Sequence, residues 1–273
     1  MAKKRGKDEE KLNYSAAVRE LKADGPKRLY LLWGPEDYLR EQYLAQLKKI
    51  CLPEGEDDFS YKRMDGPGLD PTRLREALDA IPFMSERSFV ELRNVDINKL
   101  ANADECMKLL EDIPDYCTVA FVQSAQFEPD GRLKFVKALR GEAKELKFTQ
   151  QSQGMLTDWI VRRFAAAGKS IELDAAQRLI FISGDLMSRL IPEIDKIAAY
   201  AKGERVTIKD VDAVASHIPE AVIFEMTELI SQKKYNSAMS VLAELLSDKN
   251  NEPIAMTAML GLQMRKLYAA RLA

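Results

Sequence analysis

A short segment around Gly34 has the layout of a phosphate-binding loop. The apolar run Leu29–Trp33 precedes the turn Gly34-Pro35-Glu36-Asp37, and apolar residues recur at helical spacing over residues 38–47. A strand, a tight turn and a helix in this order form the setting in which G-x-x-x-x-G-K-[ST] holds phosphates at a helix N-terminus. The segment is therefore the first place to look for nucleotide chemistry.

The residues that would contact a nucleotide are replaced throughout this loop. Counted from Gly34, the second glycine of the motif is Leu39, the lysine is Arg40 and the magnesium-binding hydroxyl is Glu41. The turn also carries two acidic residues, which would repel a polyphosphate. We therefore predict a degenerate P-loop that binds no nucleotide, and we expect no cofactor for this chain.

The second element of a P-loop ATPase is an acid that follows a buried strand, holds magnesium and helps to position water. The apolar run 118–122 is followed by Gln123-Ser124, with no acid. The letters Gly168-Lys169-Ser170 match the end of the motif, but no strand pattern precedes them, and we predict an inter-helix turn there. Because both elements are missing, we expect no catalytic site in this chain.

Composition excludes several other kinds of site. The chain has 41 basic and 43 acidic side chains and a net charge of −2, so any DNA contact is expected to be local or shared with partner subunits. Cys51, Cys106 and Cys117 are too far apart for a CxxC site and are predicted to be buried or free thiols. Since His217 is the only histidine, no metal site is expected.

The ends of the sequence bear on its location. No apolar stretch approaches the roughly 20 residues needed to span a bilayer. The first eleven residues are charged throughout and contain no apolar region typical of a secretory signal. We therefore expect a cytoplasmic protein with a leader, residues 1–27, that is mostly disordered or forms a peripheral helix.

Strand and helix patterns alternate as far as residue 149. Strands are expected at 29–33, 59–64, 88–92, 118–122 and 145–148, and helices at 38–47, 73–80, around 107–110 and at 132–139. Either Asp70 or Thr72 is expected to cap the second of these helices. The alternation predicts an α/β domain over residues 28–149 with a mainly parallel sheet covered on both faces.

From about residue 150 only helical patterns occur. Helices are predicted at 155–164, at 174–183 with Asp174 as the cap, at 186–200, from Thr207 with a capping box to Asp210, and at 222–231, 235–246 and 254–273. We divide this part into a small helical domain, 150–217, and an all-α domain, 218–273. Because the last helical pattern reaches residue 273 without a cap, we expect the last domain to be incomplete.

A second candidate site is the apolar segment Ile81-Pro82-Phe83-Met84, between a predicted helix and a predicted strand. Pro82 cannot continue the helix, so Phe83 and Met84 are expected on a turn. They either fold back onto the core or protrude and enter a pocket of a partner. Phe and Met suit the second role, because buried aromatic anchors dominate the energy of many interfaces.

Several segments, in their order and spacing, resemble the delta subunit of the bacterial DNA polymerase III clamp loader. They are residues 29–39, residues 81–90, Asp130-Gly131-Arg132-Leu133-Lys134 with Lys137, and residues 190–200, 208–211 and 223–226. The resemblance extends over residues 28–273. It implies an AAA+-like α/β domain with a degenerate P-loop, a helical lid-type domain and a helical collar domain. The collar of this family is longer than the segment that follows Pro219.

The resemblance also implies a function. Delta binds and opens the ring-shaped sliding clamp for loading onto primed DNA, without itself binding ATP, and its clamp-binding motif falls on Ile81, Pro82, Phe83 and Met84. The implied partners are the clamp, ATPase and delta-prime-type loader subunits, and primed DNA through the assembled complex. The nucleotidyltransferase activity of the DNA-directed DNA polymerase belongs to that complex. The alternative is an AAA+-like adaptor or a nucleotide-binding enzyme outside replication.

Overall fold

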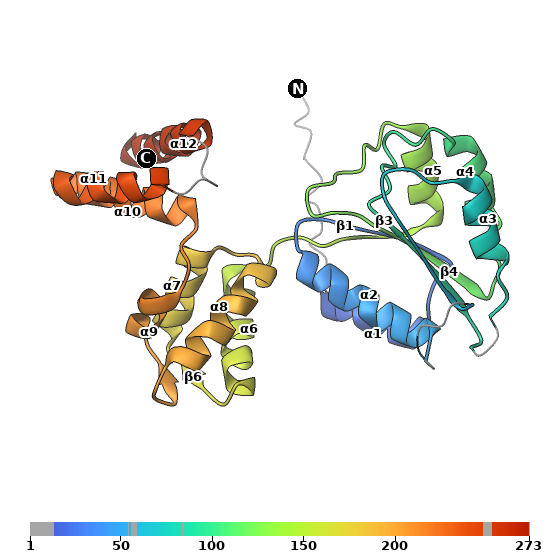
Figure 1. The fold of residues 1–273 in the computed structure, drawn as a ribbon, viewed down its shortest axis with the longest axis horizontal. Helices are drawn as coiled ribbons and strands as arrows, with labels where there is room; N and C mark the ends of the chain where they lie inside the picture. The colour runs from blue at the N-terminus through green and yellow to red at the C-terminus, as the bar shows by residue number, and fades with distance from the viewer. Residues whose placement is uncertain (1–13, 54, 56–58, 83–84, 248–252, 273) are drawn as a thin grey trace, which may run out of the picture. The chain divides into compact units, whose positions relative to one another are not determined.

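The computed structural model describes residues 14–53, 55, 59–82, 85–247 and 253–272. The chain forms two compact units, Met1–Gln150 and Gln151–Ala273. The first unit contains the sheet and the second unit is almost entirely helical (Figure 1). Each unit is described by itself.

The first unit contains a five-stranded sheet in the order β2-β3-β4-β1-β5, and all neighbouring strands are parallel. The strands are β1 (Leu29–Trp33), β2 (Tyr61–Asp65), β3 (Ser88–Arg93), β4 (Cys117–Val122) and β5 (Lys144–Lys147). Every residue of β1 and β4 is buried, which explains their unbroken apolar sequences. The edge strands β2 and β5 mix charged and apolar residues. The predicted parallel sheet is confirmed.

Helices cover both faces of this sheet (Figure 1). One face carries α1 (Tyr14–Asp24) and α2 (Asp37–Cys51), and the other carries α3 (Pro71–Asp79), α4 (Ala103–Glu111) and α5 (Lys134–Glu142). The hydrophobic core beneath α3–α5 is mostly aliphatic and includes Leu74 and Val90 together with Phe121, each fully buried.

The opposite face of the sheet is more aromatic. The ring centroid of Tyr43 in α2 lies 6.3 Å from that of Tyr30 in β1 and 5.9 Å from that of Phe148. These contacts fix α2 against the part of the sheet that carries the loop at Gly34. Helix α1 lies within the segment expected to be a leader, and it buries Ala17 and Leu21.

The second unit begins with four helices and a short parallel strand pair. Its elements are α6 (Gln153–Ala166), β6 (Ser170–Ile171), α7 (Leu173–Ser183), α8 (Met187–Tyr200), β7 (Arg205–Val206), α9 (Ile208–Val214), α10 (Pro219–Ser231), α11 (Tyr235–Ser247) and α12 (Pro253–Leu272). Helix α10 packs against α11 and α12 around Ile223, Leu245 and Met256. The division of this unit into residues 150–217 and 218–273 stays a prediction.

Two of the three helix caps predicted from the sequence are present in the structure. The Asp70 carboxylate caps α3 by accepting from the Thr72 backbone N–H at 2.9 Å, and the capping box of Thr207 with Asp210 is present. The cap predicted at Asp174 is wrong, because α7 begins one residue earlier and its cap is Glu172. The Glu172 N–H bonds to the Val206 carbonyl at 3.1 Å, so pairing next to β7 determines where α7 begins.

Three further expectations from the sequence concern an inter-helix turn, the cysteines and membrane-spanning segments. Gly168 ends the α6 turn with φ +74°, as predicted, and Ser170 already belongs to β6. The three cysteines are buried free thiols, and burial raises the pKa of Cys51 and Cys106 to about 11. In the part of the chain that the structure describes, no helix is both long enough and apolar enough to cross a membrane.

We expect Asp70→Ala to lower the free energy of unfolding by about 1 kcal/mol, because the first turn of α3 loses its side-chain cap. Asp70→Asn is the matched control, since an amide oxygen still accepts from the Thr72 N–H. Urea unfolding followed by circular dichroism measures both. Equal destabilisation by the two variants would contradict a role of Asp70 as a cap.

Candidate functional site

The loop at the end of β1 is packed against the chain that follows β5. The Phe148 N–H donates to the Trp33 carbonyl at 2.7 Å, and the Glu36 N–H donates to the Phe148 carbonyl at 3.0 Å. Gly34 has φ +118°, and a Cβ placed on it would lie 2.4 Å from the Phe148 oxygen. Gly34 is therefore required by the close approach of two backbone segments.

Arg40, at the position of the phosphate-binding lysine, turns back onto the loop. Its guanidinium Nη1 donates to the Gly34 carbonyl at 2.7 Å, and the residue is only 5% exposed. Burial lowers the pKa of Arg40, against the opposing influence of Glu41 and Asp37. Leu39, in place of the second glycine, is also buried. The cation and the apolar side chain thus lie inside the loop structure itself.

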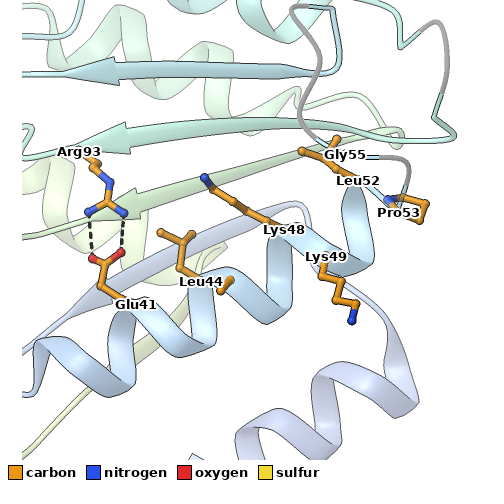
Figure 2. Close-up of a pocket in the computed structure, with 9 residues that line it drawn as sticks. Glu41, Leu44, Lys48, Lys49, Leu52, Pro53, Gly55 and Arg93 are labelled. Carbon is orange, nitrogen blue, oxygen red and sulfur yellow. Dashed lines mark hydrogen bonds and ion pairs between the residues drawn. The ribbon is translucent and has the colours of Figure 1, made fainter. Parts of the chain in front are cut away.

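Glu41, at the position of the magnesium-binding hydroxyl, makes a two-point ion pair with Arg93. Arg93 Nη1 donates to Glu41 Oε1 at 2.9 Å and Nη2 donates to Glu41 Oε2 at 2.6 Å (Figure 2). Hydrogen bonds to Glu41 raise the pKa of Arg93 above its ordinary value. This planar, bidentate geometry is the strong form of an arginine–carboxylate contact.

Arg93 also donates through Nε to Glu91, a carboxylate that is fully buried in β3. Lys48 Nζ of α2 lies 2.8 Å from Glu91 Oε2, and the Tyr61 hydroxyl of β2 donates to the same oxygen at 2.7 Å. Burial opposes ionisation of Glu91, but hydrogen bonds from Lys48, Arg93 and Tyr61 outweigh it and lower the pKa of the carboxyl. We call Glu41, Lys48, Tyr61, Glu91 and Arg93 the polar network.

The polar network adjoins a hollow of about 380 Å³ beside α2. Besides Glu41, Lys48 and Arg93, its lining includes Leu44, Ala45 and Lys49 of α2 and, after this helix, Leu52, Pro53 and Gly55. Figure 2 shows the hollow from the side of α2. The cations Lys48 and Arg93 are engaged by the carboxylates of Glu91 and Glu41. Among the described residues, no group of three or more His, Cys, Asp or Glu is placed to hold a metal ion.

Neither β4 nor β3 is followed directly by an acid. After β4, Gln123 donates its side-chain amide to the Val95 carbonyl at 3.0 Å, and its N–H bonds to the Leu32 carbonyl. After β3, Asn94 donates to the Asp65 carboxylate at 2.9 Å. In the sheet, β4 lies beside β1 and β3 lies one strand further, so these two strands end nearest to the loop after β1 on that side. The residues directly after either strand carry no carboxylate.

Of the predicted apolar segment, the structure describes Ile81 and Pro82, which lie between α3 and β3. Ile81 is 74% exposed and Pro82 is partly buried, while Phe83 and Met84 lie outside the described residues. The Ser85 hydroxyl donates to the Arg87 carbonyl at 2.6 Å, immediately before β3 begins at Ser88. Since the strands are parallel, Ile81 lies toward the amino-terminal ends of the strands, whereas Gly34 lies at their carboxyl-terminal ends. The two predicted sites are therefore not brought together.

Comparison with known proteins identifies the relatives of this chain. The family model described as DNA polymerase III, delta subunit, matches residues 30–149. The DNA polymerase III subunit delta of Bacillus subtilis (strain 168) is 27% identical over 265 residues, which cover 93% of this chain and 75% of that protein. This chain is similar to DNA polymerase III delta subunits. A probable delta subunit of Aquifex aeolicus (strain VF5) is 24% identical over 261 residues, with 90% and 71% covered.

Solved structures confirm the AAA+-like fold of this delta-subunit relative. The Bacillus subtilis DNA clamp loader delta protein matches with a TM-score of 0.57 and 22% identity, over 95% of this chain and 80% of that one. The Thermotoga maritima RuvB Holliday junction branch migration motor matches with a TM-score of 0.53 and 17% identity, over 84% and 79%. The resemblance stated from the motifs is thereby confirmed.

Reasoning from the sequence found Gly34, Leu39, Arg40 and Glu41 but missed the polar network as a group. The available signal was Glu91, an acid inside a strand that is otherwise largely apolar. A carboxylate at such a position must be paired when it is buried. Arg93 is two residues away in β3, but the partners Lys48 and Tyr61 come from α2 and β2, and only the fold reveals them.

We expect Gly34→Ala to be more destabilising than Gly66→Ala by about 2 kcal/mol. Both glycines have positive φ, +118° and +133°, so both variants incur backbone strain. Only at Gly34 does the added Cβ also meet backbone, whereas nothing lies within 4 Å of a Cβ at Gly66. Urea unfolding compares the two, and equal losses would contradict the close approach of Phe148.

We expect Glu91→Gln to lower the free energy of unfolding at pH 7 by about 3 kcal/mol, because two cations lose a buried counter-charge. Asp65→Asn, in an exposed pair with Arg63, is the control and should cost less than about 1 kcal/mol. The folded pKa of Glu91 is lowered, so its contribution is complete above its unfolded value of about 4.3 and is lost as the pH falls through the folded value. A gap between wild type and Glu91→Gln that persists in strong acid would contradict this assignment.

Proposed function

We propose that this chain acts as a clamp-loader delta subunit of a replicative DNA polymerase III holoenzyme. In this role it binds and opens the sliding clamp for loading onto primed DNA, and it does not itself bind ATP. The observation that carries the proposal is the relationship to the Bacillus subtilis delta subunit, which extends over 93% of this chain. The delta-family match over residues 30–149 supports it for the unit that contains both candidate sites.

The closed loop supports nucleotide independence. A P-loop holds phosphates with a lysine and holds magnesium through a hydroxyl. Here Arg40 is bonded to the Gly34 carbonyl, and Glu41 is bonded to Arg93. A phosphate would have to displace a buried cation from its acceptor and would also meet Glu41. Both changes disfavour binding of ATP.

The turn at the amino edge of the sheet is the proposed clamp-binding element, formed by Ile81, Pro82, Phe83 and Met84. Its support is the high exposure of Ile81, an aliphatic side chain that nothing in its own unit covers to any large extent. Ile81 lies in the connection between α3 and β3. This arrangement suits insertion into a hydrophobic pocket.

The proposed mechanism separates recognition from energy supply. The turn docks into a pocket of the clamp, and its orientation distorts the nearby interface of the ring. Partner ATPases control when the turn is exposed, so this chain responds to ATP without binding it. The all-α segment 218–273 is proposed to belong to the collar, and segment 150–217 to the lid-type domain. ATPase and delta-prime-type subunits are the proposed neighbours, with primed DNA bound by the assembled complex.

We expect this chain to bind the purified sliding clamp of the same organism without nucleotide, and Phe83→Ala to weaken binding by about 2–4 kcal/mol. Truncating an anchor removes apolar area buried in the pocket, and Ile81→Ala should act in the same direction with a smaller effect. Titration calorimetry measures each affinity. Leu133→Ala is the control, since Leu133 is a partly exposed aliphatic residue that follows β4 at the carboxyl edge.

The possible results of this experiment test the clamp-loader role separately from the assignment of the anchor residue. If wild type does not bind the clamp, the clamp-loader role is wrong and an AAA+-like adaptor outside replication is favoured. If wild type and Phe83→Ala bind equally, the role stands and the assigned anchor is wrong. Specific binding of magnesium–ATP by the isolated chain would contradict nucleotide independence and favour a nucleotide-binding protein.

A further inference from the structure

We propose that Arg93 is an internal replacement for a bound magnesium–nucleotide and holds α2 and the degenerate loop in one fixed position. The inference rests on the nucleotide independence proposed above and assigns the residue that makes it possible. In a P-loop ATPase the ligand joins the start of the helix to the ends of neighbouring strands. Here a side chain from the end of β3 makes that connection.

The charged side chains of α2 and β3 are spaced so that they face each other in pairs. Glu41 and Lys48 are seven residues apart in α2, which is close to two helical turns, so they lie on one face of the helix. Glu91 and Arg93 are two residues apart in β3 and point to the same side of the sheet. The helix presents an acid and a base, and the strand presents an acid and a base in the complementary arrangement. Figure 2 shows three of the four side chains, Glu41, Lys48 and Arg93.

Arg93 is the residue on which these contacts converge. It binds Glu41 through both terminal nitrogens and Glu91 through Nε, so one guanidinium bridges two carboxylates. The Arg93 side chain is 21% exposed and that of Glu41 is 43% exposed, whereas that of Glu91 is fully buried. Without Arg93, Glu41 would lose its bidentate partner, and Glu91 would retain Lys48 and Tyr61.

Loss of Arg93 should therefore loosen the first two turns of α2. The ion pair of Lys48 with Glu91 remains, whereas Glu41 loses its ion pair with Arg93. Glu41 is the residue of α2 that lies beside the loop. Arg40 in the same turn bonds to the Gly34 carbonyl, so loosening of this turn also opens the loop. Arg93 acts through the position of α2, and we assign it as a positioning residue.

The test is amide hydrogen exchange of the full chain, followed by mass spectrometry of peptides that cover α2. In Arg93→Gln we expect exchange over residues 37–44 to become roughly tenfold faster, the size expected for loss of a charged hydrogen-bonded pair. Glu41→Gln, which removes the charge of a more exposed side chain, should give a change in the same direction and serves if Arg93→Gln fails to fold. Arg93→Lys should rescue only in part, because it keeps the charge without the planar fork.

Arg63→Gln is the matched control. Arg63 is an arginine of the neighbouring strand β2, and its ion pair with Asp65 at 2.7 Å is about half exposed. We expect it to leave exchange in α2 unchanged. Equal effects of Arg63→Gln and Arg93→Gln, or no effect of Arg93→Gln on residues 37–44, would overturn the proposal.

Magnesium–ATP distinguishes failure of this inference from failure of the proposed function. We expect wild-type exchange and melting temperature to be unaffected by magnesium–ATP, since the loop is already closed by its own side chains. Protection of residues 37–44 by magnesium–ATP in wild type would contradict nucleotide independence, and this inference would fall with it. No protection together with an unchanged Arg93→Gln variant would overturn only the role of Arg93.

Discussion

The arrangement around the loop depends on one buried carboxylate. Glu91 lies in the middle of a parallel sheet, where an unpaired charge would carry a large desolvation penalty. Ionisation is possible there only because Lys48, Tyr61 and Arg93 supply hydrogen bonds from three elements, α2, β2 and β3. Satisfying Glu91 thus requires α2 to lie close to β3. The position of α2 in turn fixes Arg40 and Glu41 beside the loop.

This constraint explains how a P-loop scaffold keeps its shape without the residues that bind phosphate. The loop is stabilised from within by the Arg40 contact to the Gly34 carbonyl and by backbone bonds to Phe148. The glycine that remains, Gly34, is kept for the approach of Phe148, which has no connection with phosphate binding. A glycine at the position of a motif can therefore be required by packing alone.

Much of this architecture was accessible from the sequence. Unbroken apolar runs predicted the central parallel strands, and Gly34 with Leu39, Arg40 and Glu41 predicted a loop without its chemistry. The polar network was not predicted, because its members are far apart in the sequence. Tyr61 and Glu91 are separated by 30 residues and Glu41 and Arg93 by 52, and the order of the strands brings them together. The cap of α7 was misplaced for a similar reason, since it depends on a bond between Glu172 and distant Val206. Patterns within a segment reveal elements, whereas contacts between distant segments decide registers, caps and charge pairs.

Strand β3 connects the two candidate sites. It begins at Ser88, directly after the turn that carries Ile81, and it ends at Arg93 in the polar network. Six extended residues span about 20 Å, so a molecule bound at one edge does not touch the other. Because β3 is bonded to strands on both sides, it cannot lengthen or rotate alone. A side chain that fixes α2 against the carboxyl end of β3 therefore also fixes the base from which the turn at the amino end is presented. In the proposed clamp-binding role, the position of Ile81 ahead of β3 would thus depend on contacts within this unit.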